Sequence, residues 1–291
     1  MDFDAWKCSK CGYLITDTQM QNFKYDYGCP KCTMSFGDFI PIPAEEKVIM
    51  TNIGGEAIKY IENPKTKGSG IFCAIPQSEP CRVGCKDCFF MSGKSYLEPL
   101  AENLPNLPIP EDNVVYRIND GNDSSMDIDT VLRFSSVYAM RFYNTSLTYN
   151  MERFDAPTVL TVNPGVMTDV DFHQCDSEKI MYVRLRLNTW NFGGLGKECI
   201  MWYAERKIPI VVTFMRYSNE EDIPKDHREF YERKIHVENE YWSIRQSKER
   251  QIMRSCENSP FAKYIHFCGT RCRDCGNCLK LYFAYVHGGR Q

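Results

Sequence analysis

Cysteine is the residue type in this sequence that points most directly to chemistry. The chain has 15 cysteines in 291 residues, and most of them fall in three compact groups. In a reducing compartment, cysteines grouped at short spacings favour metal ligation over disulfide formation. The groups are Cys8, Cys11, Cys29 and Cys32; Cys81, Cys85 and Cys88; and Cys268, Cys272, Cys275 and Cys278.

The middle group has three cysteines at a C-x3-C-x2-C spacing, directly after a short apolar run. The run from Gly70 to Ile75 predicts a strand, and a proline-punctuated loop leads from it to Cys81. Three thiolates in one loop can hold a metal centre from one side. They leave one coordination position open, which is typical of a catalytic centre rather than a closed structural site.

This spacing resembles the signature of the radical S-adenosylmethionine (SAM) enzymes. The resemblance implies that Cys81, Cys85 and Cys88 hold a 4Fe–4S cluster in the loop after the first strand of a barrel, and that the amino and carboxylate groups of SAM bind its fourth iron. It implies reductive cleavage of SAM to methionine and a 5′-deoxyadenosyl radical, which abstracts a hydrogen atom from the substrate. An electron donor of the flavodoxin or ferredoxin type is implied as a partner. Asp87 stands where the family usually has an aromatic residue.

Read from the residues alone, the middle group has an alternative interpretation. The three cysteines could be zinc ligands with a remote fourth ligand, or reduced thiols.

The resemblance also indicates where SAM would bind. In the family, a Gly-Gly-Glu at the end of the strand after the cysteine motif binds the SAM amino group. Here the apolar run 114–118 ends in Asn119, Asp120, Gly121 and Asp123, which we expect to take that place. The alternative is a plain turn into a helix, with Ser124 or Ser125 as its N-cap.

Strands alternate with helices along the central part of the chain. Apolar runs at 138–143, 158–162, 180–187 and 208–214 predict strands, and residues 126–136 and 194–206 predict helices. With the runs at 71 and 114, six strands result, which is the number in the partial (β/α)6 barrel of the radical SAM family. We therefore expect an α/β fold with pocket residues, Asn163 among them, at the carboxyl ends of the strands.

The run 180–188 alternates between apolar and polar residues after its first position. One face carries Met181, Val183, Leu185 and Leu187, and the other carries Tyr182, Arg184, Arg186 and Asn188. If the apolar face meets the outer helices, Arg184 and Arg186 point into the lumen. There they could bind the carboxylate of SAM, or a carboxylate or phosphate of the substrate. An edge strand with solvated arginines is the alternative.

The N-terminal group forms two C-x2-C knuckles. Four cysteines complete a tetrahedral shell, and the residues around them resemble rubredoxin and zinc-ribbon modules. We expect a structural zinc ion in a ribbon spanning residues 1–46. The alternative is a redox-active iron ion bound by the same four thiolates.

The C-terminal group lies in an extension predicted to span residues 226–291. Its C-x3-C-x2-C-x2-C spacing suits a second 4Fe–4S cluster or a zinc knuckle. The charged stretch from His227 to Arg254 contains no glycine or proline and predicts one or two helices. The central domain, a radical SAM partial barrel, then spans residues 47–225.

Composition sets the remaining expectations. The content of 43% hydrophobic and 25% charged residues is ordinary for a soluble protein, and the net charge of −3 gives no overall nucleic-acid signature. The absence of a long apolar run and of a signal-peptide pattern predicts a cytoplasmic protein without a membrane partner. The flanking metal modules favour a nucleobase, a nucleotide or nucleic acid as substrate. The alternatives are a peptide-modifying radical SAM enzyme and a non-catalytic, multi-zinc nucleic-acid-binding protein.

Overall fold

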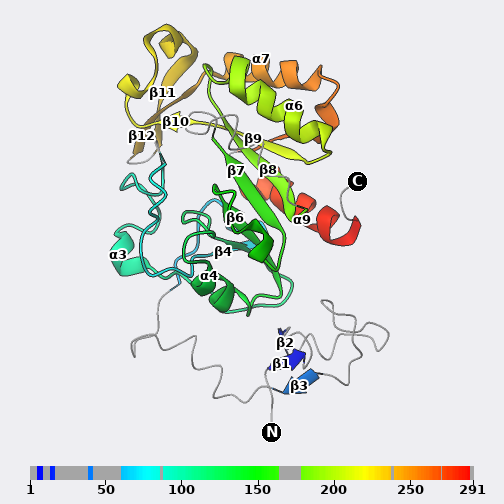
Figure 1. Ribbon diagram of the computed structural model, residues 1–291. Helices are drawn as coiled ribbons and strands as arrows, with labels where there is room; N and C mark the ends of the chain where they lie inside the picture. The colour runs from blue at the N-terminus through cyan, green and yellow to red at the C-terminus, as the bar shows by residue number, and fades with distance from the viewer. Residues whose placement is uncertain are drawn as a thin grey trace.

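A seven-stranded, all-parallel sheet forms the centre of the computed structural model of the protein (Figure 1). The structure describes residues 5–8, 14–16, 39–41, 60–85, 88–163, 178–236, 239–269 and 271–288. The sheet order is β13-β9-β8-β7-β6-β5-β4. These strands are β4 Ile71–Ala74, β5 Val115–Ile118, β6 Met140–Thr145, β7 Thr158–Val162, β8 Ile180–Leu187, β9 Ile210–Phe214 and β13 Ile265–Phe267.

The prediction of parallel strands alternating with helices is confirmed. All six expected strands are present, and β6 begins two residues later than the apolar run that predicted it. Helices α4 (Ile128–Ser135) and α6 (Lys197–Glu205) occupy the two predicted helical segments. Strands β4 to β9 are neighbours in chain order, and the sheet then gains a seventh strand, β13, from the C-terminal segment.

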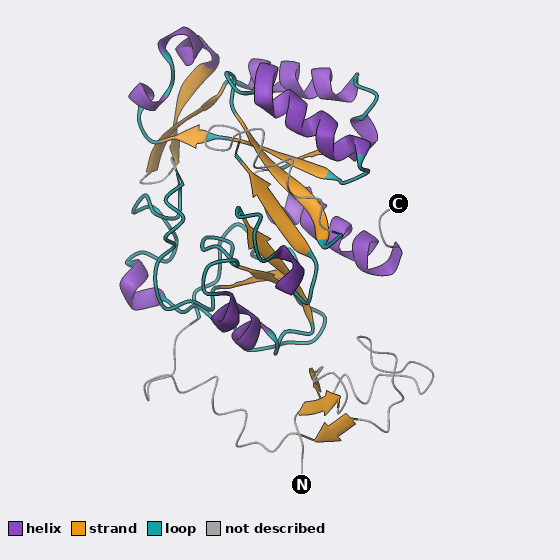
Figure 2. Cartoon of the chain, in the orientation of Figure 1, coloured by secondary structure: helices purple, strands orange, loops and turns teal. Residues whose placement is uncertain are grey.

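The two faces of the sheet are covered by different helices. Helices α4, α6 and α7 (Gln246–Glu257) pack on one face in the largest hydrophobic cluster. Helix α9 (Asn277–Gly288) packs on the other face, where Cys278 and Tyr282 join a second cluster with residues of β4 to β9. In Figure 2, α9 lies on the opposite side of the long strands from α6 and α7. We call the surface that α9 covers the α9 face of the sheet.

Strand β8 follows the predicted alternation over most of its length. Val183, Leu185 and Leu187 pack in the cluster beneath the helices of the opposite face, as expected. Met181 departs from the pattern, since it packs with Tyr182 in the cluster under α9. The reason is a shift in the pairing of β7 with β8, which inserts Met181 as an extra residue.

The prediction of one or two helices between His227 and Arg254 is confirmed only for the part that α7 occupies, and it is wrong for the residues before Gln246. A 3-10 helix at Lys225–Phe230 leads into strands β11 (Tyr231–His236) and β12 (Asn239–Ile244), and the next α-helix, α7, begins only at Gln246. β12 lies between β11 and β10 (Arg216–Tyr217) in an antiparallel sheet. Aromatic and β-branched residues such as Tyr231 and Ile244 suit such a sheet, and both are buried in its own cluster.

The N-terminal segment contains a small antiparallel sheet of order β2-β1-β3. Its strands are β1 Ala5–Cys8, β2 Leu14–Thr16 and β3 Phe39–Pro41. Cys11, Cys29 and Cys32 lie outside the described residues, so the four-cysteine zinc site stays a prediction. Two further α-helices are short: α3 (Leu100–Asn103) and α8 (Cys272–Cys275). A π-helix spans Phe192–Gly196, and short 3-10 helices span Met151–Arg153, Glu220–Asp222 and Ala262–Tyr264. Among the described helices, none is long and apolar enough to cross a membrane.

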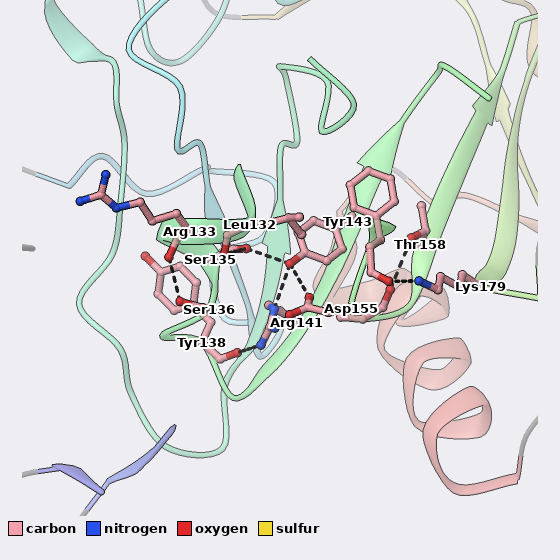
Figure 3. A network of polar contacts seen from close by, with 12 residues as sticks. Leu132, Arg133, Ser135, Ser136, Tyr138, Arg141, Tyr143, Asp155, Thr158 and Lys179 are labelled. Atoms are coloured by element: carbon pink, nitrogen blue, oxygen red, sulfur yellow. Dashed lines mark hydrogen bonds and ion pairs between the residues drawn. The ribbon is translucent and has the colours of Figure 1, made fainter. Parts of the chain in front are cut away.

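A buried polar network ties α4 to β6 and to the loop before β7 (Figure 3). The Arg141 guanidinium donates to Asp155 Oδ2 at 2.7 Å and to the Tyr138 carbonyl at 2.7 Å. The Tyr143 hydroxyl donates to Asp155 Oδ1 at 2.8 Å and lies 2.9 Å from Ser135 Oγ. Because its polar groups pair with one another, this network can be buried at little cost in stability.

Candidate functional site

The middle group of cysteines lies in the loop that follows β4, at the carboxyl end of the first strand of the parallel sheet. Cys81, Cys85 and Cys88 are free and partly exposed. Burial raises the pKa of Cys81 to about 11, and Cys88 and Cys85 add to the increase. The three thiols therefore lie close enough to influence one another electrostatically.

Two residues from other strands approach this loop. Burial and the neighbouring Cys88 raise the pKa of Cys85, while a hydrogen bond with Ser146 and the charge of Arg186 lower it. Ser146 follows β6, and Arg186 lies near the carboxyl end of β8. The cysteine loop is thus adjacent to the carboxyl ends of strands on both sides of β7, the end of a parallel sheet where ligands commonly bind.

The loop after β5 packs directly against the cysteine loop. Gly121 lies against the Phe90 ring, so closely that an added Cβ would be 2.1 Å from a ring carbon. Asn122 Nδ2 donates to the Glu79 carbonyl at 2.9 Å, just before Cys81. The structure therefore brings the predicted SAM-binding segment to the cysteines.

The carboxylates of this segment are engaged by the protein itself. Asp123 accepts hydrogen bonds from Thr145 Oγ1 at 2.7 Å and from the backbone N–H of Ser146 at 2.6 Å. Asp120 accepts hydrogen bonds from Asn63 Nδ2 and from the Tyr96 hydroxyl, the latter at 3.2 Å. These bonds hold both side chains in fixed positions.

Two buried acceptors near the loop have no protein partner among the described residues. Asn119 directly follows β5, and its Nδ2 donates to Ser124 Oγ at 3.1 Å while its Oδ1 is unpaired. Gln77 lies between β4 and Cys81; its Nε2 donates to the Asp123 carbonyl at 2.8 Å, and its Oε1 is unpaired. An unpaired buried acceptor is costly, so both oxygens are suited to an incoming donor such as an ammonium group.

The structure separates the two arginines of β8. Both lie on the face opposite Val183, Leu185 and Leu187, as predicted. Arg186 lies near Cys85, whereas Arg184 donates to Asn144 Oδ1 at 3.3 Å and to the Tyr182 hydroxyl at 3.2 Å. Arg184 influences Cys268 and Cys278 instead, so it belongs to the surroundings of the C-terminal cysteines. Asn163 is buried directly after β7.

The C-terminal cysteines lie at the carboxyl end of β13, in α8 and in the first turn of α9. All four are free; Cys278 is buried and the other three are partly exposed. Burial raises the pKa of Cys268 to about 11, and the other three thiols contribute to the shift. The structure thus gathers all four side chains in one place.

Sequence reasoning did not single out Arg117, which lies in β5 beside these cysteines. It is buried, and its Nη2 donates to Cys272 Sγ at 3.6 Å. Its only signal in the sequence is a charge within the apolar run 114–118. Lys65 is also close, since its backbone carbonyl accepts a 3.0 Å hydrogen bond from the Cys272 N–H.

Within the described ranges, no group of three or more Cys, His, Asp or Glu side chains is arranged to hold a metal ion. The cysteine groups are gathered but not in a ligating arrangement. Thiols release their protons and move together when a metal binds. The kinds of side chain gathered at each place therefore decide whether a metal centre fits there. Three thiols next to unpaired acceptors fit a 4Fe–4S cluster with SAM, and four gathered thiols fit a closed centre.

Comparison of the chain with protein-family models, with curated proteins and with solved structures found no match.

Proposed function

We propose that this protein is a radical SAM enzyme whose cluster is held by Cys81, Cys85 and Cys88. The observation that carries the proposal is the packing of the cysteine loop after β4 against the loop after β5, where Gly121 meets Phe90. Strands β4 to β9 also follow one another in chain order, as in the partial barrel of that family. The (β/α)6 barrel is part of this proposal.

The protein's own residues have defined roles in this proposal. Asn119 Oδ1 and Gln77 Oε1 are unpaired acceptors for the SAM ammonium group. Arg186, beside Cys85, is suited to the SAM carboxylate, because a guanidinium binds a carboxylate through two parallel hydrogen bonds. The cluster and SAM together supply reductive cleavage of SAM and hydrogen-atom abstraction.

The substrate class we propose is a nucleobase, a nucleotide or nucleic acid. Support comes from the basic residues near the cysteine groups. Desolvation lowers the pKa of Lys65, and Arg216 and Arg117 add to the decrease, so the three cations lie close together. Arg117 is buried, whereas Lys65 and Arg216 are exposed, and these two exposed cations favour a phosphate-bearing substrate.

Iron, sulfide and zinc content and the visible spectrum of the full chain, purified without oxygen, test the proposal. We expect at least about four irons per chain and acid-labile sulfide. We also expect production of 5′-deoxyadenosine from SAM when dithionite is added. Zinc without sulfide would contradict the proposal and favour a zinc-dependent binding protein.

Variants assign the activity to the three cysteines. Cys81→Ser, Cys85→Ser and Cys88→Ser should each abolish SAM cleavage. Cys199→Ser is the matched control, because Cys199 lies in α6 and is buried in the cluster on the opposite face of the sheet from α9. Equal loss of cleavage in the control would mean that the effect is on folding and not on the cluster.

A further inference from the structure

The α9 face of the sheet carries two guanidinium groups that face cysteines, one buried (Arg117) and one half-buried (Arg184). Arg117 projects from β5 and Arg184 from β8, and both lie on this face. Burying a charge is costly unless an opposite charge lies nearby. The face therefore requires a source of negative charge.

Two other groups that act on Arg117 do not meet this requirement. Cys73 acts on it most strongly, but burial raises the pKa of this thiol well above its usual value, so it stays neutral. Asp120 also contributes, but its oxygens accept hydrogen bonds from Asn63 and Tyr96. Arg184 is bonded to an amide oxygen and a hydroxyl, both neutral. Arg117 Nε is buried without any hydrogen-bond partner among the described residues.

Sulfur atoms of the C-terminal cysteines are the groups that both arginines share. Arg117 Nη2 donates to Cys272 Sγ at 3.6 Å, and Arg184 interacts electrostatically with Cys278 and Cys268. The Tyr182 hydroxyl donates to Cys278 Sγ at 3.0 Å. These contacts favour thiolates over neutral thiols on this face.

Cys278 shows most clearly how these contacts favour a thiolate. Its sulfur is buried and accepts the 3.0 Å hydrogen bond of the Tyr182 hydroxyl, and that hydroxyl in turn accepts a hydrogen bond from Arg184 Nη2 at 3.2 Å. Four thiolates around one zinc ion, or around one oxidised 4Fe–4S cluster, leave a double negative charge. That charge matches the two guanidiniums, whereas four neutral thiols would leave both of them uncompensated.

We infer that Cys268, Cys272, Cys275 and Cys278 hold a four-thiolate metal centre on the α9 face, with Arg117 and Arg184 as its charge partners. The centre is separate from the one proposed at Cys81, Cys85 and Cys88 and does not depend on it. The cysteines of this centre also link the two edges of the sheet. The backbone bond from Cys272 to Lys65 joins α8 to the segment before β4, although β13 and β4 are the two edge strands of the sheet.

The test uses the full chain with the seven cysteines of the other two groups replaced by serine. These replaced residues are Cys8, Cys11, Cys29, Cys32, Cys81, Cys85 and Cys88. We expect this variant to retain either zinc or iron with sulfide, which identifies the metal. Adding Cys272→Ser and Cys278→Ser should remove the metal, whereas adding Cys256→Ser should not, because Cys256 packs on the opposite face.

A second measurement applies to the chain with all its cysteines, in case the multiple variant does not fold. The C-terminal cysteines should resist alkylation by N-ethylmaleimide until a chelator is added, as read by mass spectrometry of their peptides. Immediate alkylation in the metal-loaded protein would overturn the inference. So would a folded seven-serine variant that contains no metal. Neither result depends on SAM cleavage, so each is distinguishable from a failure of the proposed function.

The rate of metal release tests whether Arg117 and Arg184 are charge partners of the centre. Arg117→Gln and Arg184→Gln should speed transfer of the metal to a chelator, by about 10–100-fold as for other outer partners of metal ligands. Arg117→Lys, which keeps the charge, should have a smaller effect. Arg133→Gln on the exposed surface of α4 is the control. Unchanged release from both glutamine variants would show that the arginines are not charge partners of the centre.

Discussion

Gly121 and Phe90 are in van der Waals contact, although they belong to loops that follow different strands. Gly121 comes three residues after the end of β5, and Phe90 comes two residues after Cys88. A Cβ added to Gly121 would lie 2.1 Å and 2.5 Å from two carbons of the Phe90 ring. This close approach requires glycine at position 121.

Gly121→Ala should therefore destabilise the protein, by about 1–3 kcal/mol as for other overpacked sites. Urea unfolding of the full chain measures the change. Gly193→Ala is the control, since nothing lies within 4 Å of its added Cβ. Combining Gly121→Ala with Phe90→Ala should recover part of the loss. Additive effects in the double variant would contradict direct contact between the two residues.

Asp123 positions Ser146, which is hydrogen-bonded to Cys85. Its carboxylate accepts bonds from the Ser146 N–H at 2.6 Å and from the Ser146 hydroxyl at 2.7 Å. Asp123→Asn replaces an acceptor with a donor, and should cost about 2–4 kcal/mol, since bonds to charged groups are worth about 1.5–3 kcal/mol each. It should also lower the iron content of anaerobically purified protein.

Asp127→Asn is the matched control for this prediction, because Asp127 is exposed and its left-handed backbone conformation suits asparagine. If Asp123→Asn unfolds in urea like the control, the carboxylate does not organise the loop.

The ion pair of Arg141 with Asp155 should contribute far more to stability than the exposed pair of Arg153 with Asp129. The Arg141 side chain is 7% exposed, whereas Asp129 is 84% exposed. Arg141→Met removes the guanidinium from the Asp155 carboxylate, which keeps only the hydrogen bond of the Tyr143 hydroxyl, and should cost about 3–5 kcal/mol. Asp129→Asn should cost less than about 1 kcal/mol. Chemical unfolding of both variants decides this comparison, and equal losses would contradict it.

Stability should fall in alkaline solution because of Tyr143. Burial raises its pKa from 10.0 to about 12, although Arg141 opposes the shift. Above pH 10 the unfolded chain releases a proton that the folded chain retains, so the free energy of unfolding decreases until the pH reaches about 12. Tyr143→Phe should show a shallower decrease over this range. Parallel curves for the two proteins would show that Tyr143 does not contribute.

The sequence by itself determined the local elements of the sheet. Alternation and apolar runs located β7 and β8 to the residue, because a buried parallel strand needs a continuous run of suitable side chains. The spacing of Cys81, Cys85 and Cys88 likewise identified a group that could share one metal centre. Both signals are local, so neither depends on the rest of the chain.

Only the tertiary structure decided which distant residues meet. Arg117 and Cys272 are 155 positions apart, and no spacing rule relates them. Strands β11 and β12 were mistaken for helix, because a short charged segment with scattered aromatics suits either element until β10 provides a pairing partner. β13 was missed, since three residues give little periodicity before they pair with β9. The pairing of strands and the burial of charge depend on the whole fold.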